Sequence, residues 1–327
     1  MTVLVTGSSG HLGEALMRTL QAQRRETIGI DIQPGAFTHY VGSIADRAFV
    51  RRCMKNVTTV LHAATLHKPH VATRSRQDFV DVNISGTLNL LEEAAAAGVT
   101  AFVYTSTTSV FGDALVPPPG EPAAWVTEDV TAVPKNIYGV TKAAAEDLCQ
   151  LFARSHSLRA IVLRTSRFFP EEDDNPVVRE AYADANIKTN EFLYRRVDIE
   201  DVVSAHLLAA QHATAAGFAK YIISATTLFS RHDAAELRND APRVVCRYVP
   251  DFEVEFARRG WTMIPGIDRV YVNDRARTDL GWQPRNDFRA LIARLRAGED
   301  IRSPLAREVG SKGYHDRVFH EGPYPVE

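Results

Sequence analysis

The chain has 327 residues, of which 45% are hydrophobic, so it is long enough for one large α/β domain, or for one such domain and a smaller lobe. The formal net charge of −2 gives no electrostatic reason to expect a nucleic acid or a membrane surface as a partner. No apolar run of about 18 residues is present, and the three scattered cysteines lack metal-ligand spacing, so we expect a cytoplasmic protein with reduced thiols.

The first element is an apolar strand that breaks into a glycine-rich turn. Gly7, Gly10 and Gly13 follow in the spacing T-G-x-x-G-x-x-G, and helix-forming residues come directly after them. In such a strand–turn–helix, the pyrophosphate of a dinucleotide lies against backbone N–H groups at the helix N-terminus. We expect Gly7 to permit the tight turn, Gly10 to let the phosphates approach the backbone, and Gly13 to let the helix lie close to the strand.

Asp31 ends the second predicted strand, at the distance from the glycine turn where a dinucleotide site places an acidic residue. A carboxylate there accepts hydrogen bonds from the ribose hydroxyls of the adenosine and repels a 2′-phosphate. No arginine follows directly, so the sequence favours NAD over NADP. An ordinary acidic residue at a strand end is the alternative. Residues 42–46 follow where we expect contacts with the adenine edge.

Apolar runs alternate with helical patterns through the first half of the chain. The predicted strands are 3–6, 27–30, 59–62, 101–105 and 160–163, and the predicted helices are about 14–23, 47–53, 80–97 and 138–155. This alternation predicts a parallel sheet with helices on both faces. Four prolines predict an irregular loop at 116–122.

Beyond residue 164 the alternation is less regular. The acidic run 171–176 predicts a loop, 198–210 a helix and 220–224 a strand. We expect an α/β chain with a Rossmann-type, doubly wound parallel sheet and a small C-terminal α/β substrate lobe. The expected division is 1–166 with 197–224 for the dinucleotide-binding domain, 167–196 with 225–300 for the lobe, and 301–327 for a tail or partner-facing arm.

Tyr138 and Lys142 are the most informative pair of residues. Positions i and i+4 share one helix face, so the phenol and the ammonium project side by side. The pKa of an unperturbed tyrosine is about 10, and lowering it by three units takes roughly 4 kcal/mol of preferential stabilisation of the phenolate. A nearby lysine and a positive nicotinamide ring supply that stabilisation in a partly desolvated cleft, so we expect Tyr138 to act as an acid/base.

A run of hydroxyl side chains ends the apolar strand upstream of this pair. Thr105, Ser106, Thr107, Thr108 and Ser109 follow one another there. The C-terminal ends of parallel strands are where open α/β sheets bind ligands. A hydroxyl at that place can hold a substrate oxygen while Tyr138 moves the proton. Strand propensity alone is the alternative explanation of the run.

Together these features resemble the extended short-chain dehydrogenase/reductases, in the NAD-dependent epimerase/dehydratase family, and within it the nucleotide-sugar epimerases. The motifs are Thr6-Gly7-x-x-Gly10-x-x-Gly13, Asp31, Leu61-His62-Ala63-Ala64, Asn83-x-x-Gly86-Thr87-x-Asn89-Leu90-Leu91, 105–112, Tyr138-x-x-x-Lys142 and Leu280-Gly281-Trp282-Gln283-Pro284. They occur in the family's order, densely to residue 165 and in patches to residue 290.

The resemblance implies NAD as the cofactor, Tyr138 as the acid/base, Lys142 as its partner and Thr107 as the catalytic hydroxyl. It also implies that Asn83 fixes the backbone near the active site, with helix capping as the alternative. The cofactor-binding residues expected in this way are Gly7, Ser9, Gly10, His11, Leu12, Gly13, Asp31, Ile32, Ser43, Ile44, His62, Ala63, Ala64, Asn83, Thr105, Tyr138 and Lys142.

Three departures from the family pattern bear on the substrate. Thr108 and Ser109 stand where 4,6-dehydratases of the family have an Asp-Glu pair, which disfavours dehydration. The family's asparagine is not evident in 164–170, where an arginine occupies its likely position. The segment 167–198 is also short for a lobe that clamps a nucleoside diphosphate, so a free sugar, a sugar acid or a polyol stays open as the substrate.

Cationic side chains near the strand ends are candidate ligands for an anionic substrate, although each is more often a solvated surface charge. The expected substrate residues are His67, Thr107, Thr108, Arg167 and Arg196, with Lys68, His70 and Arg195 as further candidates. His67-x-x-His70 has no third ligand at metal-binding spacing, so we expect no metal.

The leading hypothesis is an NAD-dependent sugar epimerase, first of all a nucleotide-sugar epimerase, that acts by transient oxidation to a ketone. The alternatives are an NAD-dependent dehydrogenase of a sugar, sugar acid or other secondary alcohol, and a non-catalytic NAD-binding regulatory protein. We expect a small-molecule substrate, no nucleic acid or membrane partner, and a homodimer formed through the helices at 80–97 and 138–155.

Overall fold

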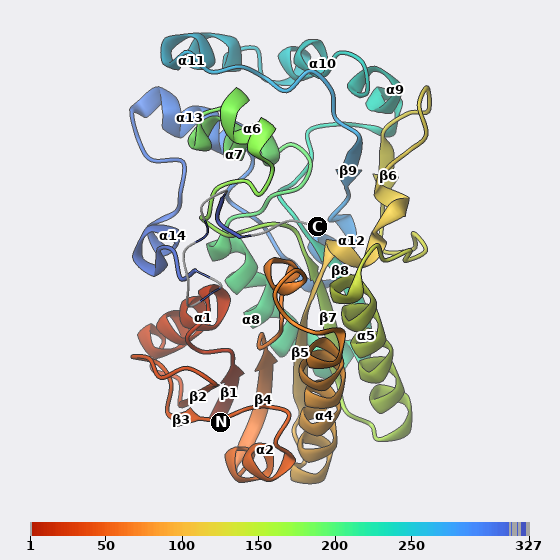
Figure 1. Cartoon of the computed structure of the whole chain (residues 1–327), viewed down its shortest axis with the longest axis vertical. Coiled ribbons are helices and arrows are strands. Elements are labelled where there is room, and N and C mark those ends of the chain that lie inside the picture. The colour runs from red at the N-terminus through yellow and green to blue at the C-terminus, as the bar shows by residue number, and fades with distance from the viewer. Residues whose placement is uncertain (1, 314, 316–318, 320–321, 325–327) are drawn as a thin grey trace.

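The computed structural model describes the whole chain except residues 1, 314, 316–318, 320–321 and 325–327 (Figure 1). Its centre is a seven-stranded sheet in the order β3-β2-β1-β4-β5-β7-β8, in which each neighbouring pair is parallel. The strands are β1 (Thr2–Thr6), β2 (Thr27–Asp31), β3 (Tyr40–Val41), β4 (Val57–His62), β5 (Ala101–Thr107), β7 (Ala160–Thr165) and β8 (Phe218–Ile223). The expected doubly wound parallel sheet is therefore confirmed.

Helices cover both faces of this sheet, as Figure 1 shows. One face carries α1 (His11–Ala22) and α8 (Ile199–Ala216), and the other carries α2 (Arg47–Cys53), α4 (Gly86–Ala97) and α5 (Ile137–Ser155). The side chains of successive residues in β1 point alternately to the two faces of the sheet. Val3 and Val5 lie in the core with α1 and α8, and Leu4 lies in the core with α4 and α5.

The smaller lobe lies beyond the carboxyl ends of the strands, at the top of Figure 1. Its elements are the parallel pair β6 (Ala124–Val126) and β9 (Arg269–Tyr271), with α6 (Pro176–Ala181), α7 (Asp184–Glu191), α9 (Ala234–Leu237), α10 (Ala241–Tyr248), α11 (Phe252–Arg259) and α13 (Phe288–Ala297). Phe192, Phe252 and Phe288 share its core. The lobe is thus built around one hydrophobic core of its own.

Two segments fall outside the expected division between domain and lobe. β6 comes from the first half of the chain but pairs with β9 of the lobe. Conversely, α12 (Asp274–Leu280) and the fully buried Trp282 lie in the core that contains α8, and the indole Nε1 donates to the carbonyl of Asp201 at 3.1 Å. The expected division followed the order of the chain and therefore placed both segments in the wrong part. Short elements lie where residues far away in the sequence pack against them.

The segment expected as a tail contains regular structure instead. α14 (Pro304–Val309) begins at Ser303, whose hydroxyl caps the helix by accepting from the amide of Ala306 at 3.1 Å. Val309 is buried in the same core as α1. The chain then runs across the start of α1, where Lys312 forms an ion pair with Glu14 at 2.6 Å. The described part of this segment is therefore a component of the fold.

The helix expected over 80–97 is divided. α3 (Arg76–Phe79) leads into a π-helical stretch, Val80–Ser85, and only then into α4. Short 3-10 turns at Lys68–His70, Thr108–Phe111, Asp113–Leu115 and Arg231–Asp233 complete the described elements. Across the described residues, none of the helices has both the length and the apolar character that a membrane span needs.

Candidate active site

A cavity of about 710 Å³ opens at the carboxyl ends of β1, β4, β5 and β7, between the sheet and the lobe. The residues predicted for the site that line it are Gly7, Ser9, Gly10, His11, Leu12, Gly13, Asp31, Ile32, Ala63, His67, Thr105, Thr107, Thr108, Tyr138, Lys142 and Arg167. The sequence motifs thus converge on one place from five separate parts of the chain.

The glycine turn forms one end of the cavity. Gly7 has a φ of +74°, a conformation that glycine adopts without strain. A Cβ at Gly13 would lie 1.8 Å from the carbonyl oxygen of Gly7, so a glycine is required where α1 passes the turn. Gly10 is the N-cap of α1, and the first backbone N–H groups of this helix face the place expected for a pyrophosphate.

Asp31 lies at the end of β2 beside this turn. Its carboxylate accepts hydrogen bonds from the backbone amides of Ser9 at 3.0 Å and Gln33 at 2.9 Å. These bonds fix the carboxylate on the cavity wall, where its remaining lone pairs can accept ribose hydroxyls. The glycine turn and this carboxylate together fit NAD.

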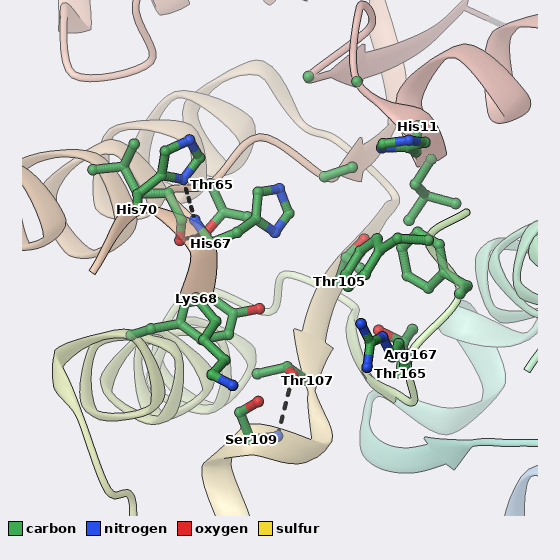
Figure 2. Close-up of a pocket in the computed structure, with 18 of the residues that line it drawn as sticks. His11, Thr65, His67, Lys68, His70, Thr105, Thr107, Ser109, Thr165 and Arg167 are labelled. Carbon is green, nitrogen blue, oxygen red and sulfur yellow. Dashed lines mark hydrogen bonds between the residues drawn. The ribbon is translucent and has the colours of Figure 1, made fainter. Parts of the chain in front are cut away.

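Tyr138 and Thr107 meet on the floor of the cavity. The side chain of Tyr138 is buried, and both residues line the cavity. Thr107 also accepts from the backbone amide of Ser109 at 3.1 Å, which fixes its rotamer (Figure 2). Burial raises the pKa of Tyr138 to about 12, against the opposing influence of the Thr107 hydroxyl. The phenol is therefore protonated at neutral pH in the protein alone.

Lys142 lies behind this pair, one helical turn after Tyr138. Its Nζ donates to the carbonyl of Thr105 at 2.6 Å and lies 4.2 Å from the centre of the Tyr104 ring. Burial lowers the pKa of Lys142 to about 7, against the opposing charge of Glu146. In the protein alone, desolvation of the phenol dominates the pKa of Tyr138, and Nζ of Lys142 is directed to the carbonyl of Thr105. The lowering expected from Lys142 and a nicotinamide ring together stays a prediction for the NAD-bound protein.

A buried ionic cluster fixes the lower part of α5 to the sheet. Glu146 accepts from the hydroxyl of Ser106 at 2.6 Å and from Nη2 of Arg164 at 2.7 Å, and it forms an ion pair with Lys220 at 3.1 Å. Glu146 is one turn after Lys142 on the same helix face. The cluster therefore sets the position of Lys142 against β5. No motif indicated this cluster, although Tyr138, Lys142 and Glu146 follow one another at i, i+4 and i+8.

His206 is a second buried support that the sequence analysis missed. Its Nδ1 donates to the carbonyl of Val202 at 2.8 Å, so Nε2 is the acceptor for the hydroxyl of Thr105, also at 2.8 Å. Burial lowers the pKa of His206 to about 4, which keeps the ring neutral. The hydroxyl of Thr105 therefore donates its proton to His206 and cannot donate it to a ligand in the cavity.

Five of the expected cofactor residues do not line the cavity: Ser43, Ile44, His62, Ala64 and Asn83. Ile44 is in the core beneath α4, and the hydroxyl of Ser43 accepts from the amide of Ala45 in a local turn. His62 is buried between the hydroxyls of Thr6 at 2.8 Å and Thr87 at 3.0 Å, where it holds β1, β4 and α4 together. These side chains support the site from behind rather than face it.

Asn83 supports the site through the backbone. Its Oδ1 accepts from the amide of Leu66 at 2.8 Å, and its Nδ2 donates to the hydroxyl of Thr141 at 3.1 Å. The residue lies inside the π-helical stretch, so it does not cap a helix terminus. The backbone-fixing alternative is the one that this geometry supports.

His67 lies across the cavity from the hydroxyl end of β5, in the turn that also holds His70 (Figure 2). Its ring centre is 6.3 Å from that of Tyr138. Burial, followed by the charges of His70 and Lys142, lowers the pKa of His67 to about 3. His67 therefore meets a ligand as a neutral imidazole and not as the cation that an anion ligand would require.

Arg167 and Arg195 line the lobe side of the cavity, and both form ion pairs with Asp173, at 2.7 and 2.8 Å. Arg196, expected beside them, is not in this cavity. The backbone of Arg196 forms an isolated parallel β-bridge with that of Arg167, so this segment is extended. Consecutive side chains of an extended segment point to opposite sides, so Arg195 faces the cavity and Arg196 faces away.

Several lining residues had no signal in the sequence, because the lobe and the C-terminal segment bring them from far along the chain. They are Phe168, Phe169, Asp174, Arg269, Tyr271, Lys312, Gly313, His315 and Tyr324. Within the described residues, no three His, Cys, Asp or Glu side chains are grouped so as to hold a metal ion.

The family model described as the NAD dependent epimerase/dehydratase family matches residues 3–223 of this chain. The chain belongs to this family. It is accordingly an NAD-dependent enzyme of the extended short-chain dehydrogenase/reductase type, and the cofactor and enzyme class expected from the sequence are confirmed. The five predicted motifs in the cavity all fall within the matched residues.

Relatives of this chain include both epimerases and dehydratases. The UDP-glucose 4-epimerase of Rhizobium leguminosarum is 26% identical over 330 residues, covering 89% of this chain and 95% of that protein. The dTDP-glucose 4,6-dehydratase of Streptomyces antibioticus is 27% identical over 336 residues, covering 90% and 91%. The protein y4nG of Sinorhizobium fredii is 33% identical over 169 residues, and this match spans 50% of the chain but 40% of that protein.

Among solved structures, a short-chain dehydrogenase/reductase superfamily protein from Agrobacterium tumefaciens with bound NAD has a TM-score of 0.66 and 25% identity. The comparison covers 94% of this chain and 99% of that one. The likeness therefore extends over the sheet and the lobe together.

Proposed function

We propose that the protein is an NAD-dependent sugar epimerase that oxidises a secondary alcohol of its substrate to a ketone and reduces the ketone on the other face. The observation that carries the proposal is that Tyr138, Thr107 and Lys142 line one cavity at the strand end, with Lys142 anchored on the carbonyl of Thr105. Full-length similarity to UDP-glucose 4-epimerases makes a nucleotide sugar the first substrate class to test.

The proposed chemistry divides between cofactor and chain. NAD, when bound, supplies a reversible hydride acceptor, held by the glycine turn, Asp31 and Lys142. The phenol oxygen of Tyr138 exchanges a proton with the substrate hydroxyl as the ketone forms and is reduced again. Thr107 holds the same substrate oxygen. Net oxidation of the substrate is zero, because the hydride that leaves the carbon returns to it.

Dehydration fits the site less well. Elimination of water needs a carboxyl group near the reacting carbon, and Thr108 and Ser109 follow Thr107 instead. The carboxyl side chains that line the described cavity are Asp31, at the adenosine end, and Asp174. Asp174 is ion-paired with Lys68 at 2.6 Å. Neither carboxylate is therefore placed to act beside Tyr138.

A dehydrogenase of a sugar acid or another secondary alcohol is the second candidate. Arg167, Arg195 and Arg269 line the lobe side of the cavity, and guanidinium groups bind a carboxylate as well as a phosphate. Such an enzyme would release NADH. The third hypothesis, a non-catalytic NAD-binding protein, requires that Tyr138, Thr107 and Lys142 be retained without use.

The deciding experiment mixes the purified protein and NAD with nucleotide sugars, free sugars and sugar acids. Each mixture is followed at the absorbance of NADH and then by proton NMR. We expect a new stereoisomer without net NADH. Stoichiometric NADH with an oxidised product would replace the epimerase by the dehydrogenase. Bound NAD without turnover over the whole panel would favour the non-catalytic protein.

We also propose a homodimer through α4 and α5. Val140 and Leu151 on α5 are 48% and 43% exposed, which leaves apolar side chains on the outer face of this helix. Light scattering should give twice the mass of the chain, and the variant Leu151→Glu should lower it. A monomeric mass for the native protein would contradict the proposal.

A further inference from the structure

A second cavity, of about 480 Å³, lies on the other side of the loop that follows β7. Phe168, Phe169 and His11 line both cavities, so they form the wall between them. Further walls come from α7, the end of α13 and α14, and from the segments that hold 192–199, Trp261 and 299–302. Small-molecule sites typically enclose about 300–1,000 Å³, so this cavity is large enough for a ligand of its own.

The walls of this cavity are mostly apolar. Trp261 and Phe192 present aromatic rings, and Ile301 and Val309 present aliphatic side chains. Most of the charged side chains in the wall already have partners. Lys188 is ion-paired with Asp184 at 2.5 Å. An occupant therefore meets a predominantly hydrophobic surface.

Two further wall charges are also satisfied. Arg302 is ion-paired with Asp300 at 2.6 Å. The carboxylate of Asp198 accepts from the amides of Glu200 at 2.8 Å and Ser303 at 3.1 Å. Glu299 is exposed to solvent. Arg196 is a further cation of the described wall, and although it is ion-paired with Glu191 at 2.6 Å, it keeps a buried nitrogen without a hydrogen-bond partner.

Arg196 is 5% exposed and lines this cavity but not the first. Its Nε donates to Glu191 at 2.6 Å and its Nη1 to the carbonyl of Phe169 at 2.9 Å. Its Nη2 is buried and has no hydrogen-bond partner among the described residues. A buried donor without an acceptor is costly, so an acceptor supplied by a ligand is favoured at this point.

We propose that the second cavity binds a small aromatic carboxylate, with the carboxylate on Arg196 and the ring among Trp261, Phe168 and Phe192. The guanidinium selects a negatively charged acceptor, and the apolar walls select a ring rather than a sugar. The site is separate from the cofactor and substrate cavity and is not needed for the proposed reaction.

The test uses 2-naphthoate as the probe and naphthalene-2-methanol as an uncharged probe of the same ring. Isothermal titration is carried out on protein saturated with NAD, so that the first cavity is occupied. We expect 2-naphthoate to bind at one site per chain and at least tenfold more tightly than the alcohol. Equal affinity of the two probes, or no binding of 2-naphthoate, would overturn the proposal.

Three variants locate the probe. Arg196→Met should weaken 2-naphthoate at least tenfold. Arg167→Met is the matched control, since Arg167 also contacts Glu191, at 3.3 Å, but lines only the first cavity, and it should change the affinity less than twofold. Ala306→Phe fills the second cavity without removing a charge and should abolish binding even if Arg196→Met does not fold.

The variants and a competition measurement with UDP decide whether 2-naphthoate binds in the second cavity. Binding that survives Ala306→Phe, or that Arg167→Met weakens as much as Arg196→Met, would place the probe elsewhere and refute the assignment. Displacement of 2-naphthoate by UDP would make the cavity part of the substrate site, which also overturns it. Lack of displacement by UDP supports a separate site, whatever the reaction in the first cavity proves to be.

Discussion

Asn83 and Thr141 are joined by a hydrogen bond of 3.1 Å that connects the segment after β4 to the helix of Tyr138 and Lys142. The hydroxyl of Thr141 donates to the carbonyl of Ile137 at 2.9 Å, so it is the acceptor for Nδ2 of Asn83. The two residues are 58 positions apart. The side chain of Asn83 thus sets the distance between the wall of the cavity at Leu66 and the helix of Tyr138 and Lys142.

Replacing Asn83 should therefore disturb catalysis through position. In Asn83→Ala the amide of Leu66 and the hydroxyl of Thr141 lose a buried partner, so we expect unfolding to become easier by about 1–3 kcal/mol and turnover to fall roughly tenfold. Urea unfolding and steady-state rates measure the two effects. Asn83→Asp is the control, because it keeps the acceptor for the amide of Leu66 and loses the donor to Thr141 and to the carbonyl of Leu66. Equal rates in the native protein and Asn83→Ala would contradict a positioning role.

Tyr138→Phe tests the proposed proton transfer. The variant removes the phenol oxygen and keeps the ring, which is buried, so the fold and NAD binding should change little. General acid–base catalysis contributes about 10²–10⁴-fold, so we expect turnover to fall by at least about a hundredfold. NMR of the product measures turnover, and fluorescence quenching measures NAD affinity. Full activity in Tyr138→Phe would exclude the proposed role of this residue.

Two glycines of the turn should respond differently to alanine. A Cβ at Gly13 would lie 1.8 Å from the oxygen of Gly7, whereas one at Gly10 would lie 3.3 Å from the same atom. Gly13→Ala must displace backbone, and we expect it to lower the free energy of unfolding by about 3 kcal/mol or more even without NAD. Gly10→Ala should fold nearly as well as the native protein and weaken NAD, since the added methyl group faces the phosphates. Thermal unfolding with and without NAD distinguishes the two variants. Equal melting temperatures and equal stabilisation by NAD in both variants would contradict the different roles given to Gly10 and Gly13.

The sequence predicted those parts of the site whose geometry depends on residues close together in the chain. Tyr138 and Lys142 share a helix face whatever the rest of the chain does, and the glycine turn follows from the closeness of strand and helix. The side on which Arg195 and Arg196 point was not predictable, because it depends on the register of a short extended segment against Arg167. Lys312 is 298 residues from its partner Glu14, and no local pattern encodes such a contact.

The buried supports form a second group that local patterns did not place. His62 belongs to a motif whose neighbour Ala63 lines the cofactor cavity, yet the side chain of His62 is in the interior. In a strand, alternate side chains point to opposite faces, so a motif marks the place of a site but not which of its members touch the ligand.

The shifted pKa of Lys142 predicts how stability depends on pH. Burial lowers the pKa of Lys142 from 10.5 to about 7 in the folded protein. Between those values the unfolded chain holds a proton that the folded chain lacks, so the free energy of unfolding should rise with pH, by up to about 1.4 kcal/mol per unit. The contribution is fully present above the unfolded pKa and is lost as the pH falls through 7. Lys142→Met lacks the titrating group and serves as the reference. Urea unfolding at pH 7, 8 and 9 should give a native-minus-variant difference that grows with pH, and a flat difference would show that Lys142 keeps its proton when the chain folds.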